Sequence, residues 1–402
     1  MSQIKNANKE RKQMKDSYIS KRYWEDQATP MGKFGAMAKN FDDVIALSLG
    51  DPDIITDELI IEKALRDAKA GHTKYTEFRG DPELRTEIAK FYQEEYDISV
   101  EDEEIFIITG ACVGMYLVME SILDDGDEVI IHSPYFTPYT QQITLARGIP
   151  VILDTYEEEG FQISTPRLEA LITERTKAII LNTPCNPTGN CQTRQTMMAI
   201  ADIANRHDLL IIADDIYTAY SFAEPFIPIM SLPEMKKRTI TLNSGSKDFA
   251  MTGWRIGNII APPNIIKTIQ QVNENVVFTA PSVSQRALLH ALRNRKIIQP
   301  LLIEEYKKRV IYAAKRITDI ANMSVLPPSG TFYLFVNIKK TGLTSEEVSM
   351  KMLEEAHVIT IPGIAFGQSG EGYIRIACTQ NVNILKEAFD RIEKMDIFKG
   401  DE

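Results

Sequence analysis

The chain has few residues that could form a metal site or a disulfide. It contains only 4 cysteines and 5 histidines in 402 residues. The histidines show no HExxH-type cluster, so we predict no metal site. The cysteines show no CxxC pairing, which argues against disulfides and fits a reducing cytoplasm. These cysteines are Cys112, Cys185, Cys191 and Cys378.

Long apolar runs and an excess of positive charge are also missing. No stretch approaches the roughly 20 apolar residues that a membrane span requires. Residues 1–12 are polar and basic and lack the apolar core of a signal peptide. A net charge of −11 disfavours nucleic acid and anionic membranes as main partners. These absences predict a cytoplasmic protein.

What the chain does contain is an alternation of helical and strand patterns from about residue 56. Its 44% hydrophobic and 25% charged residues are ordinary for a soluble globular protein. The alternation predicts an α/β fold with a mostly parallel sheet flanked by helices. The predicted helices are 57–70, 82–95 and 111–123, and the predicted strands are 105–109, 128–132, 150–153, 177–181 and 209–213.

The carboxyl-terminal third has an α+β pattern instead, which predicts a smaller second domain. We expect residues 1–55 to form an amino-terminal arm and part of this small domain, with the arm itself in residues 1–40. Residues 56–296 form the large domain and residues 297–402 the rest of the small one. Its predicted helices are 297–323, 344–355 and 382–394, and its predicted strands are 330–336 and 373–377.

One connection combines a lysine and an arginine in a way that suggests chemistry. A Gly/Ser-rich segment between predicted strands 238–242 and 255–261 carries Lys247, and Arg255 follows eight positions later at the start of the second strand. A lysine that attacks a carbonyl needs a confined site. An arginine can grip a phosphate through two parallel hydrogen bonds. The pair favours an aldehyde cofactor with a phosphate, such as pyridoxal phosphate, although most lysines are solvated surface charges.

Three further segments place polar groups at predicted strand ends, where open α/β sheets bind ligands. The helix that starts after strand 105–109 presents backbone N–H groups suited to an anion, although many structural turns look alike. The loop at 182–189 contains Asn186-Pro187, a candidate cis peptide, although it could also be a simple turn. Asp214 ends a buried strand and needs a cationic or hydrogen-bonding partner. A protonated pyridine nitrogen would supply one, and a helix-capping role is the alternative.

Taken in order, these segments resemble a known family. Thr-Gly-Ala, Ser-Pro-Tyr-Phe, Asn-Pro-Thr-Gly, Asp-Asp-Ile-Tyr, Ser-Gly-Ser-Lys…Gly-Trp-Arg-Ile-Gly and Tyr-Ile-Arg-Ile follow one another between residues 49 and 375. The set resembles fold type I pyridoxal-phosphate enzymes of the class I/II aminotransferases, in the aspartate aminotransferase superfamily. The resemblance implies ping-pong transfer of an amino group from an L-amino acid to a 2-oxo acid. It also implies a homodimer with shared active sites.

The resemblance also implies a role for each matching residue. Lys247 matches the lysine that binds the cofactor aldehyde and later carries the substrate proton. Asp214 matches the carboxylate that keeps the pyridine nitrogen protonated, and Asn186 and Tyr217 match the groups that hydrogen-bond the ring's phenolic oxygen. The other matches are Phe136, which stacks on the ring; Ala111, Cys112, Ser244 and Arg255 around the phosphate; Tyr75 toward the partner subunit's phosphate; and Gly50, Asn186 and Arg375 around the substrate.

Several alternatives remain open on the sequence. Aspartate-specific relatives often carry a lysine where this chain has Cys112, which disfavours an aspartate specialist. Ser-Gly-Ser-Lys also resembles the lysine motif of carbon–sulfur β-lyases, whereas Met-Thr-Gly-Trp-Arg-Ile-Gly is more typical of aminotransferases. Ser244-x-x-Lys247 with Lys340-Thr-Gly would fit a serine acyltransferase, but that class needs a third motif that is absent. The amino donor, whether alanine, aromatic, branched or dicarboxylic, is not defined by the sequence.

Overall fold

The structure, a computed structural model, describes residues 40–399 and, before them, only positions 18, 20, 32, 35, 37 and 38. The arm predicted at residues 1–40 therefore lies almost entirely outside the described residues.

A seven-stranded sheet forms the centre of the large domain. Its strand order is β2-β8-β7-β6-β5-β3-β4. Only β8 runs antiparallel to its neighbours, so the predicted mostly parallel sheet is confirmed. The strands are β2 (Ile105–Ile108), β3 (Glu128–Ser133), β4 (Ile149–Asp154), β5 (Thr176–Asn182), β6 (Leu210–Asp214), β7 (Thr239–Ser244) and β8 (Gly257–Ile260).

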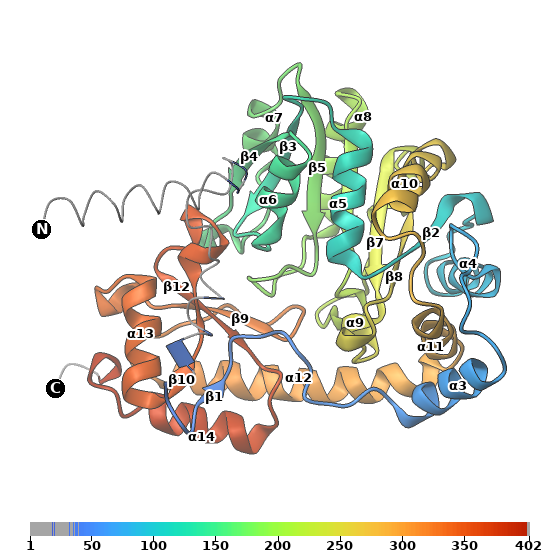
Figure 1. Cartoon of the computed structure of the whole chain (residues 1–402). Coiled ribbons are helices and arrows are strands. Elements are labelled where there is room, and N and C mark those ends of the chain that lie inside the picture. Colours follow the sequence, from blue (N-terminus) through green and yellow to red (C-terminus); the bar gives the residue numbers. More distant parts are fainter. Residues whose placement is uncertain are drawn as a thin grey trace, which may run out of the picture.

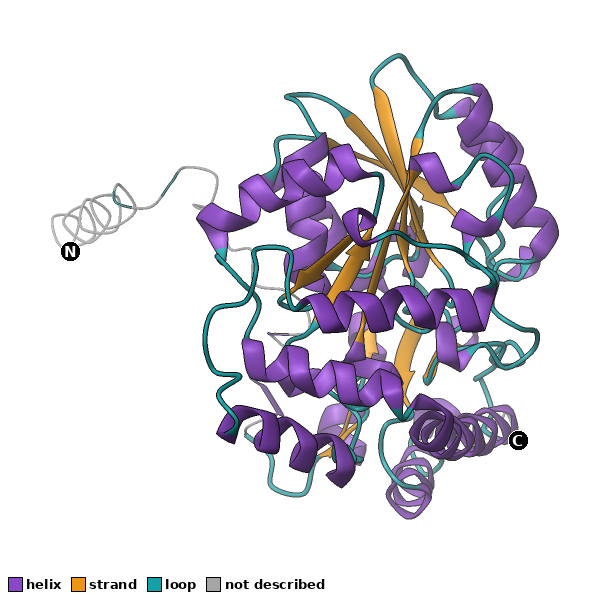
Figure 2. Cartoon of the chain, turned by 90° about the vertical axis from the view of Figure 1, so that its right-hand side faces the viewer, coloured by secondary structure: helices purple, strands orange, loops and turns teal. Residues whose placement is uncertain are grey.

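Helices cover both faces of this sheet (Figure 2). Successive strand residues point to opposite faces, so Ile180 packs toward one helix layer and Ile179 toward the other. Burial on both faces explains why β5 and β6 read as unbroken apolar runs. One face carries α5 (Ala111–Ile122), α6 (Pro138–Leu145) and α10 (Pro263–Val276), the other α7 (Thr165–Ala170) and α8 (Arg194–Arg206), and α3 (Glu58–Lys69), α4 (Pro82–Tyr96) and α11 (Ser282–Arg293) pack beside β2.

The small domain joins the two ends of the described chain. β1 (Ile45–Ala46) pairs in parallel with β10 (Val358–Ile359), which brings the segment after residue 40 into this domain, as predicted. Beside them lies the antiparallel sheet β11-β12-β9. The remaining elements are β11 (Ile361–Pro362), β12 (Tyr373–Ala377), β9 (Tyr333–Asn337), α13 (Ser345–Ala356) and α14 (Val382–Ile392).

One long helix, α12 (Arg295–Asp319), runs under the large domain and into the small domain, where α14 lies below it (Figure 1). Near its start, Ile298 packs into the cluster formed with α3, α4 and α11. Further along, Val310 packs into the small-domain core. Because the helix crosses between two cores, the domain division at residue 296 stays a prediction.

Three further findings concern only the described residues. No helix there is both long and apolar enough to cross a membrane. No group of three or more His, Cys, Asp or Glu side chains there is placed to hold a metal ion. The four cysteines are free.

Candidate active site

A cavity of about 470 Å³ lies at the carboxyl edge of the central sheet. The parallel strands β5, β6 and β7 all end at this edge, so the side chains that follow them converge. Every predicted site residue except Tyr75 lines the cavity. They are Gly50, Ala111, Cys112, Phe136, Asn186, Asp214, Tyr217, Ser244, Lys247, Arg255 and Arg375.

Lys247 enters the cavity from α9 (Gly245–Asp248), a short helix directly after β7. The Ser244 hydroxyl caps this helix by accepting a hydrogen bond from the Ser246 backbone N–H at 3.0 Å. The Lys247 ammonium donates to the carbonyl of Gly50 at 2.5 Å. The hydroxyl of Tyr220 donates to the Lys247 carbonyl at 3.0 Å. The lysine is therefore held on both its backbone and its side chain.

Asp214 is the last residue of β6, and only 7% of it is exposed. The Tyr139 hydroxyl donates to its Oδ2, whereas its Oδ1 is buried without any hydrogen-bond partner. Burial raises the pKa of Asp214 to about 6. A cation next to Oδ1 would satisfy this oxygen and keep the carboxylate ionised.

Asn186 and Tyr217 reach the cavity from the loops after β5 and β6. The Asn186-Pro187 peptide is cis, as predicted. The Asn186 Oδ1 accepts a hydrogen bond from Arg375 at 2.8 Å. The hydroxyl oxygen of Tyr217 lies 3.1 Å from that of Tyr333. Burial raises the pKa of Tyr217, so it is protonated at neutral pH and has a proton to donate.

A candidate anion site lies at the start of α5. Gly110 precedes the helix with φ of 78°, and no side chain caps the first turn. A Cβ on Gly110 would overlap the guanidinium of Arg255, so this arginine lies directly against the helix start. Unpaired N–H groups, the helix dipole and a guanidinium together favour a phosphate.

Arg375, on β12, is 1% exposed and lies between two aromatic rings. Its guanidinium carbon is 4.4 Å from the Tyr333 ring centre and 4.9 Å from the Phe366 ring centre. It also donates to the carbonyl of Ser48. No carboxylate of the described chain pairs with it, and its Nε has no hydrogen-bond partner. A buried guanidinium in this state is suited to an incoming carboxylate.

The two remaining aromatic predictions have different positions. Phe136 lines the cavity and packs edge-on against Tyr139, with ring centres 5.6 Å apart. Tyr75 lies outside the cavity and is 81% exposed. It packs edge-on against Phe278 at 4.9 Å.

Tyr139, Asn182 and Tyr333 are among the cavity residues that were not predicted from the sequence. Tyr139 lies three positions after Phe136 on α6, and Asn182 begins the Asn186 loop, so both stood next to predicted motifs. Tyr333 had no such signal. It belongs to β9 in the small domain and meets Tyr217 only through the tertiary structure.

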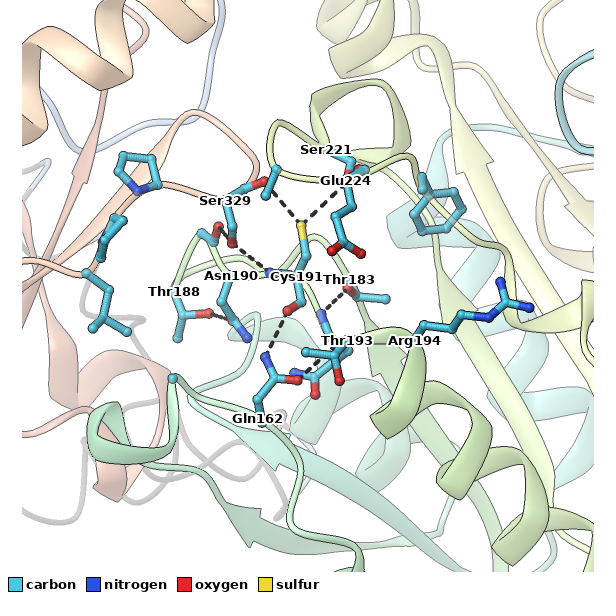
Figure 3. A pocket seen from close by; sticks show the side chains of 18 of the residues that line it. Gln162, Thr183, Thr188, Asn190, Cys191, Thr193, Arg194, Ser221, Glu224 and Ser329 are labelled. Carbon is cyan, nitrogen blue, oxygen red and sulfur yellow. Dashed lines mark hydrogen bonds between the residues drawn. The ribbon is translucent and has the colours of Figure 1, made fainter.

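A second cavity, of about 380 Å³, lies behind the loop that carries Asn186 (Figure 3). Residues of this loop and of the segment before β9 line it together. The Cys191 backbone N–H donates to the Ser329 hydroxyl at 3.0 Å, and the Gly330 N–H donates to the Gly189 carbonyl at 2.8 Å. These bonds fix the Asn186 loop against the segment that leads into β9.

Replacing Gly189 with alanine is expected to destabilise the protein by about 2–4 kcal/mol, because strain and overpacking add. Gly189 has φ of 70°, and a Cβ there would lie 2.5 Å from the Tyr333 carbonyl oxygen. Gly160→Ala is the matched control, since Gly160 has φ of 63° but no atom near its Cβ position. Urea unfolding should show the larger loss for Gly189→Ala. Equal losses would contradict the close approach.

Comparison with known proteins now decides the family. The model of the aminotransferase class I and II family matches residues 42–392. The chain belongs to this family. The pyridoxal 5'-phosphate that these aminotransferases use is therefore its cofactor. Family membership excludes the serine acyltransferase interpretation, and Lys340 lies in a 3₁₀ turn (Lys339–Thr341) away from the cavity.

Similar proteins include aminotransferases with different substrates in their names. The chain is 39% identical to an aspartate aminotransferase of Pyrococcus abyssi over 89% of its length and 93% of the relative. It is 37% identical to aromatic-amino-acid aminotransferase 2 of Thermococcus litoralis over 89% and 93%. A structure of Thermus thermophilus aspartate aminotransferase with maleate superposes with a TM-score of 0.89 at 30% identity, covering 94% of this chain and 99% of that one. These names favour the aminotransferase over the β-lyase interpretation.

Proposed function

We propose that the cavity binds pyridoxal phosphate through the residues predicted from the sequence and uses it to transaminate an amino acid with an uncharged side chain. The observation that carries this proposal is the convergence of Lys247, Asp214, Arg255 and Arg375 on one cavity. The residues fit the cofactor at both ends. Asp214 has a buried, unpartnered oxygen for a ring N–H, and the α5 start with Arg255 suits a phosphate.

The cofactor is held at four points in this proposal. Arg255, Ser244 and the N–H groups of Ala111 and Cys112 bind the phosphate. Asp214 binds the ring nitrogen, Asn186 and Tyr217 donate to the ring oxygen, and Phe136 lies on the ring face. When bound, the cofactor supplies an electron sink that makes the α-proton of an attached amino acid acidic.

The chain's own groups then perform the remaining steps. The Lys247 amine would hold the cofactor aldehyde covalently until a substrate amine replaces it. Once free, this amine would act as the base that removes the substrate α-proton and then as the acid that delivers it to the cofactor carbon on the other side of the substrate nitrogen. Arg375 holds the substrate carboxylate through two parallel hydrogen bonds, with Gly50 and Asn186 beside it. Water would release the first substrate as an oxo acid, and a second oxo acid would take up the amino group by the reverse steps.

The uncharged donor is inferred from the charges in the cavity. Among the described residues, the only cations that line it are Lys247, Arg255 and Arg375, and each already has a role. None of these three remains for a second carboxylate. Cys112, at the position where aspartate-specific relatives often carry lysine, is neutral, and the apolar side chains of Phe136 and Met115 line the same cavity.

A half-reaction screen tests this function directly. Purified protein is loaded with pyridoxal phosphate, and the visible band of the lysine-bound cofactor is followed as single amino acids are added. Phenylalanine, leucine or alanine should remove the band faster than aspartate or glutamate. A protein that gains no visible band with the cofactor would refute the site, and a preference for aspartate would refute only the donor. Release of pyruvate and ammonia from cysteine would identify a lyase.

Replacing Cys112 with lysine is expected to raise the half-reaction rate with aspartate about tenfold or more, because a charge-assisted hydrogen bond to the distal carboxylate contributes about 1.5–3 kcal/mol. Cys112→Met is the control, since it is similar in length but neutral. The ratio of the aspartate rate to the phenylalanine rate is the quantity to compare. An unchanged ratio would show that this position does not face the donor side chain.

We infer further that two copies assemble with shared sites. Tyr75 lies outside the cavity of its own chain, and it forms an exposed aromatic cluster with Phe78 and Phe278. Exposed aromatic side chains that pack together mark interaction surfaces. Sedimentation should give twice the 45.4 kDa of one chain, and Tyr75→Phe should weaken phosphate binding. A monomer with full activity would contradict this assembly.

A further inference from the structure

One buried side chain, Tyr333, contacts three of the groups assigned above. Its hydroxyl lies 3.1 Å from the hydroxyl of Tyr217. Its ring centre lies 4.4 Å from the guanidinium carbon of Arg375. Its hydroxyl also occupies the space above Gly50, where any Cβ would overlap it, and the Gly50 carbonyl accepts the Lys247 hydrogen bond. Tyr333 therefore connects the ring-oxygen, carboxylate and lysine groups of the site.

The position of Tyr333 is fixed from its backbone side. Its N–H donates to the Thr331 hydroxyl at 2.9 Å, and its carbonyl lies against Gly189. Four positions before it, the Ser329 hydroxyl accepts a hydrogen bond from the backbone N–H of Cys191, in the loop that carries Asn186 (Figure 3). Only 3% of Tyr333 is exposed. Such a side chain has little freedom to change rotamer, which is what a precise site requires.

We propose that Tyr333 is a positioning residue for the reaction, whose hydroxyl donates to Tyr217 and whose ring orients the Arg375 guanidinium. This proposal rests on the function proposed above. It adds a residue from the small domain to the hydrogen-bond chain that reaches the cofactor ring.

The direction of the hydrogen bond follows from counting protons. A tyrosine hydroxyl has one proton and two lone pairs. If Tyr217 donates its proton to the phenolic oxygen of the cofactor, it can only accept from Tyr333. Chained hydrogen bonds polarise one another, so a bond from Tyr333 strengthens the bond that Tyr217 donates. That bond stabilises negative charge on the ring oxygen and so lowers the pKa of the lysine-bound cofactor.

The ring of Tyr333 acts on Arg375, which is assigned to the substrate carboxylate. Together with Phe366 it forms an aromatic slot around the Arg375 guanidinium. Arginine stacks on aromatic faces without giving up its in-plane donors. The slot leaves these donors free for Asn186 and for a carboxylate. Loss of the ring should therefore weaken substrate binding, whereas loss of the hydroxyl alone should not.

The test compares holoenzyme variants by spectroscopic titration and by kinetics. Tyr333→Phe removes the hydroxyl and keeps the ring, and Tyr333→Leu removes both. Tyr373→Phe is the matched control, because Tyr373 is a buried tyrosine on the same small sheet whose hydroxyl bonds to Glu157 outside the cavity. Tyr217→Phe and the Tyr217/Tyr333 double variant complete a mutant cycle.

Tyr333→Phe should raise the pH midpoint of the visible band by about half a unit, in the direction of Tyr217→Phe but less, and leave KM within about twofold. Tyr333→Leu should add a rise in KM of about tenfold or more. In the Tyr217→Phe protein, removing the Tyr333 hydroxyl should not change the midpoint further. If Tyr333→Phe kept the wild-type pH midpoint, as the control Tyr373→Phe should, the proposal would be overturned. It would also be overturned if the loss of the Tyr333 hydroxyl shifted the midpoint equally in the wild-type and in the Tyr217→Phe protein. If Tyr333→Phe does not fold, Tyr333→Leu must show the same midpoint shift. Failure of the proposed function would show differently, as a wild-type protein without any visible band.

Discussion

Replacing Lys247 with alanine is expected to lower turnover by at least about 10⁴-fold, because one amine provides both the covalent bond and the proton transfer. The phosphate and ring-nitrogen groups are untouched, so the cofactor should stay bound after dialysis. Its spectrum should be that of the free aldehyde, without the lysine-bound band. Steady-state turnover with the best donor from the half-reaction screen measures the loss.

Two comparisons make this result specific to Lys247. Lys340→Ala removes an exposed lysine from the small domain and should keep full activity. A small primary amine added to Lys247→Ala should restore part of the proton transfer, because the truncated side chain leaves room beside Gly50. Activity within about tenfold of wild type would show that another group removes the proton.

Replacing Asp214 with asparagine is expected to lower turnover by about 10²- to 10³-fold, because the ring nitrogen loses the charge that keeps it protonated. The side chain has nearly the same shape, so Tyr139 can still donate to it. Cofactor affinity should fall with turnover, and fluorescence titration of the apoprotein measures it. Asp202→Asn, an exposed change on α8, is the control and should alter neither quantity. Unchanged turnover in Asp214→Asn would contradict the assignment.

Asp214 also gives the apoprotein a pH signature. Its pKa is about 6 in the folded state against 3.8 for an ordinary Asp. Between these values the unfolded carboxyl loses its proton while the folded one keeps it. The stability of the folded state therefore falls as pH rises from about 4 to about 6, by about 3 kcal/mol in total, and is constant above. Asp214→Asn cannot titrate, so the difference in stability between wild type and variant should shrink by this amount over the same pH range. A constant difference would show that Asp214 is not buried in its neutral form.

Much of the order of strands and helices could be predicted from the sequence, because it depends on local patterns of apolar and polar residues. β5 and β6 are continuous apolar runs that end in polar residues, and burial on both faces of a parallel sheet produces that pattern. Helices α6, α7, α8, α10 and α11 were not predicted, although Thr193 caps α8 and Pro263 opens α10. Their start signals were local, but α6 and α7 are short and weakly periodic, so packing against the sheet decides their conformation.

The sequence by itself was enough to predict the family. It also predicted twelve site residues, of which eleven line one cavity in the structure. Motif residues at the ends of parallel strands must meet, since all such ends lie on one edge of the sheet. Only the tertiary structure decided the rest. Tyr139, Tyr333 and the aromatic slot around Arg375 depend on how the small domain and α6 pack onto that edge. Contacts between segments more than 100 residues apart in the chain, such as Tyr217 with Tyr333, leave no local pattern, because each partner alone looks like an ordinary core aromatic.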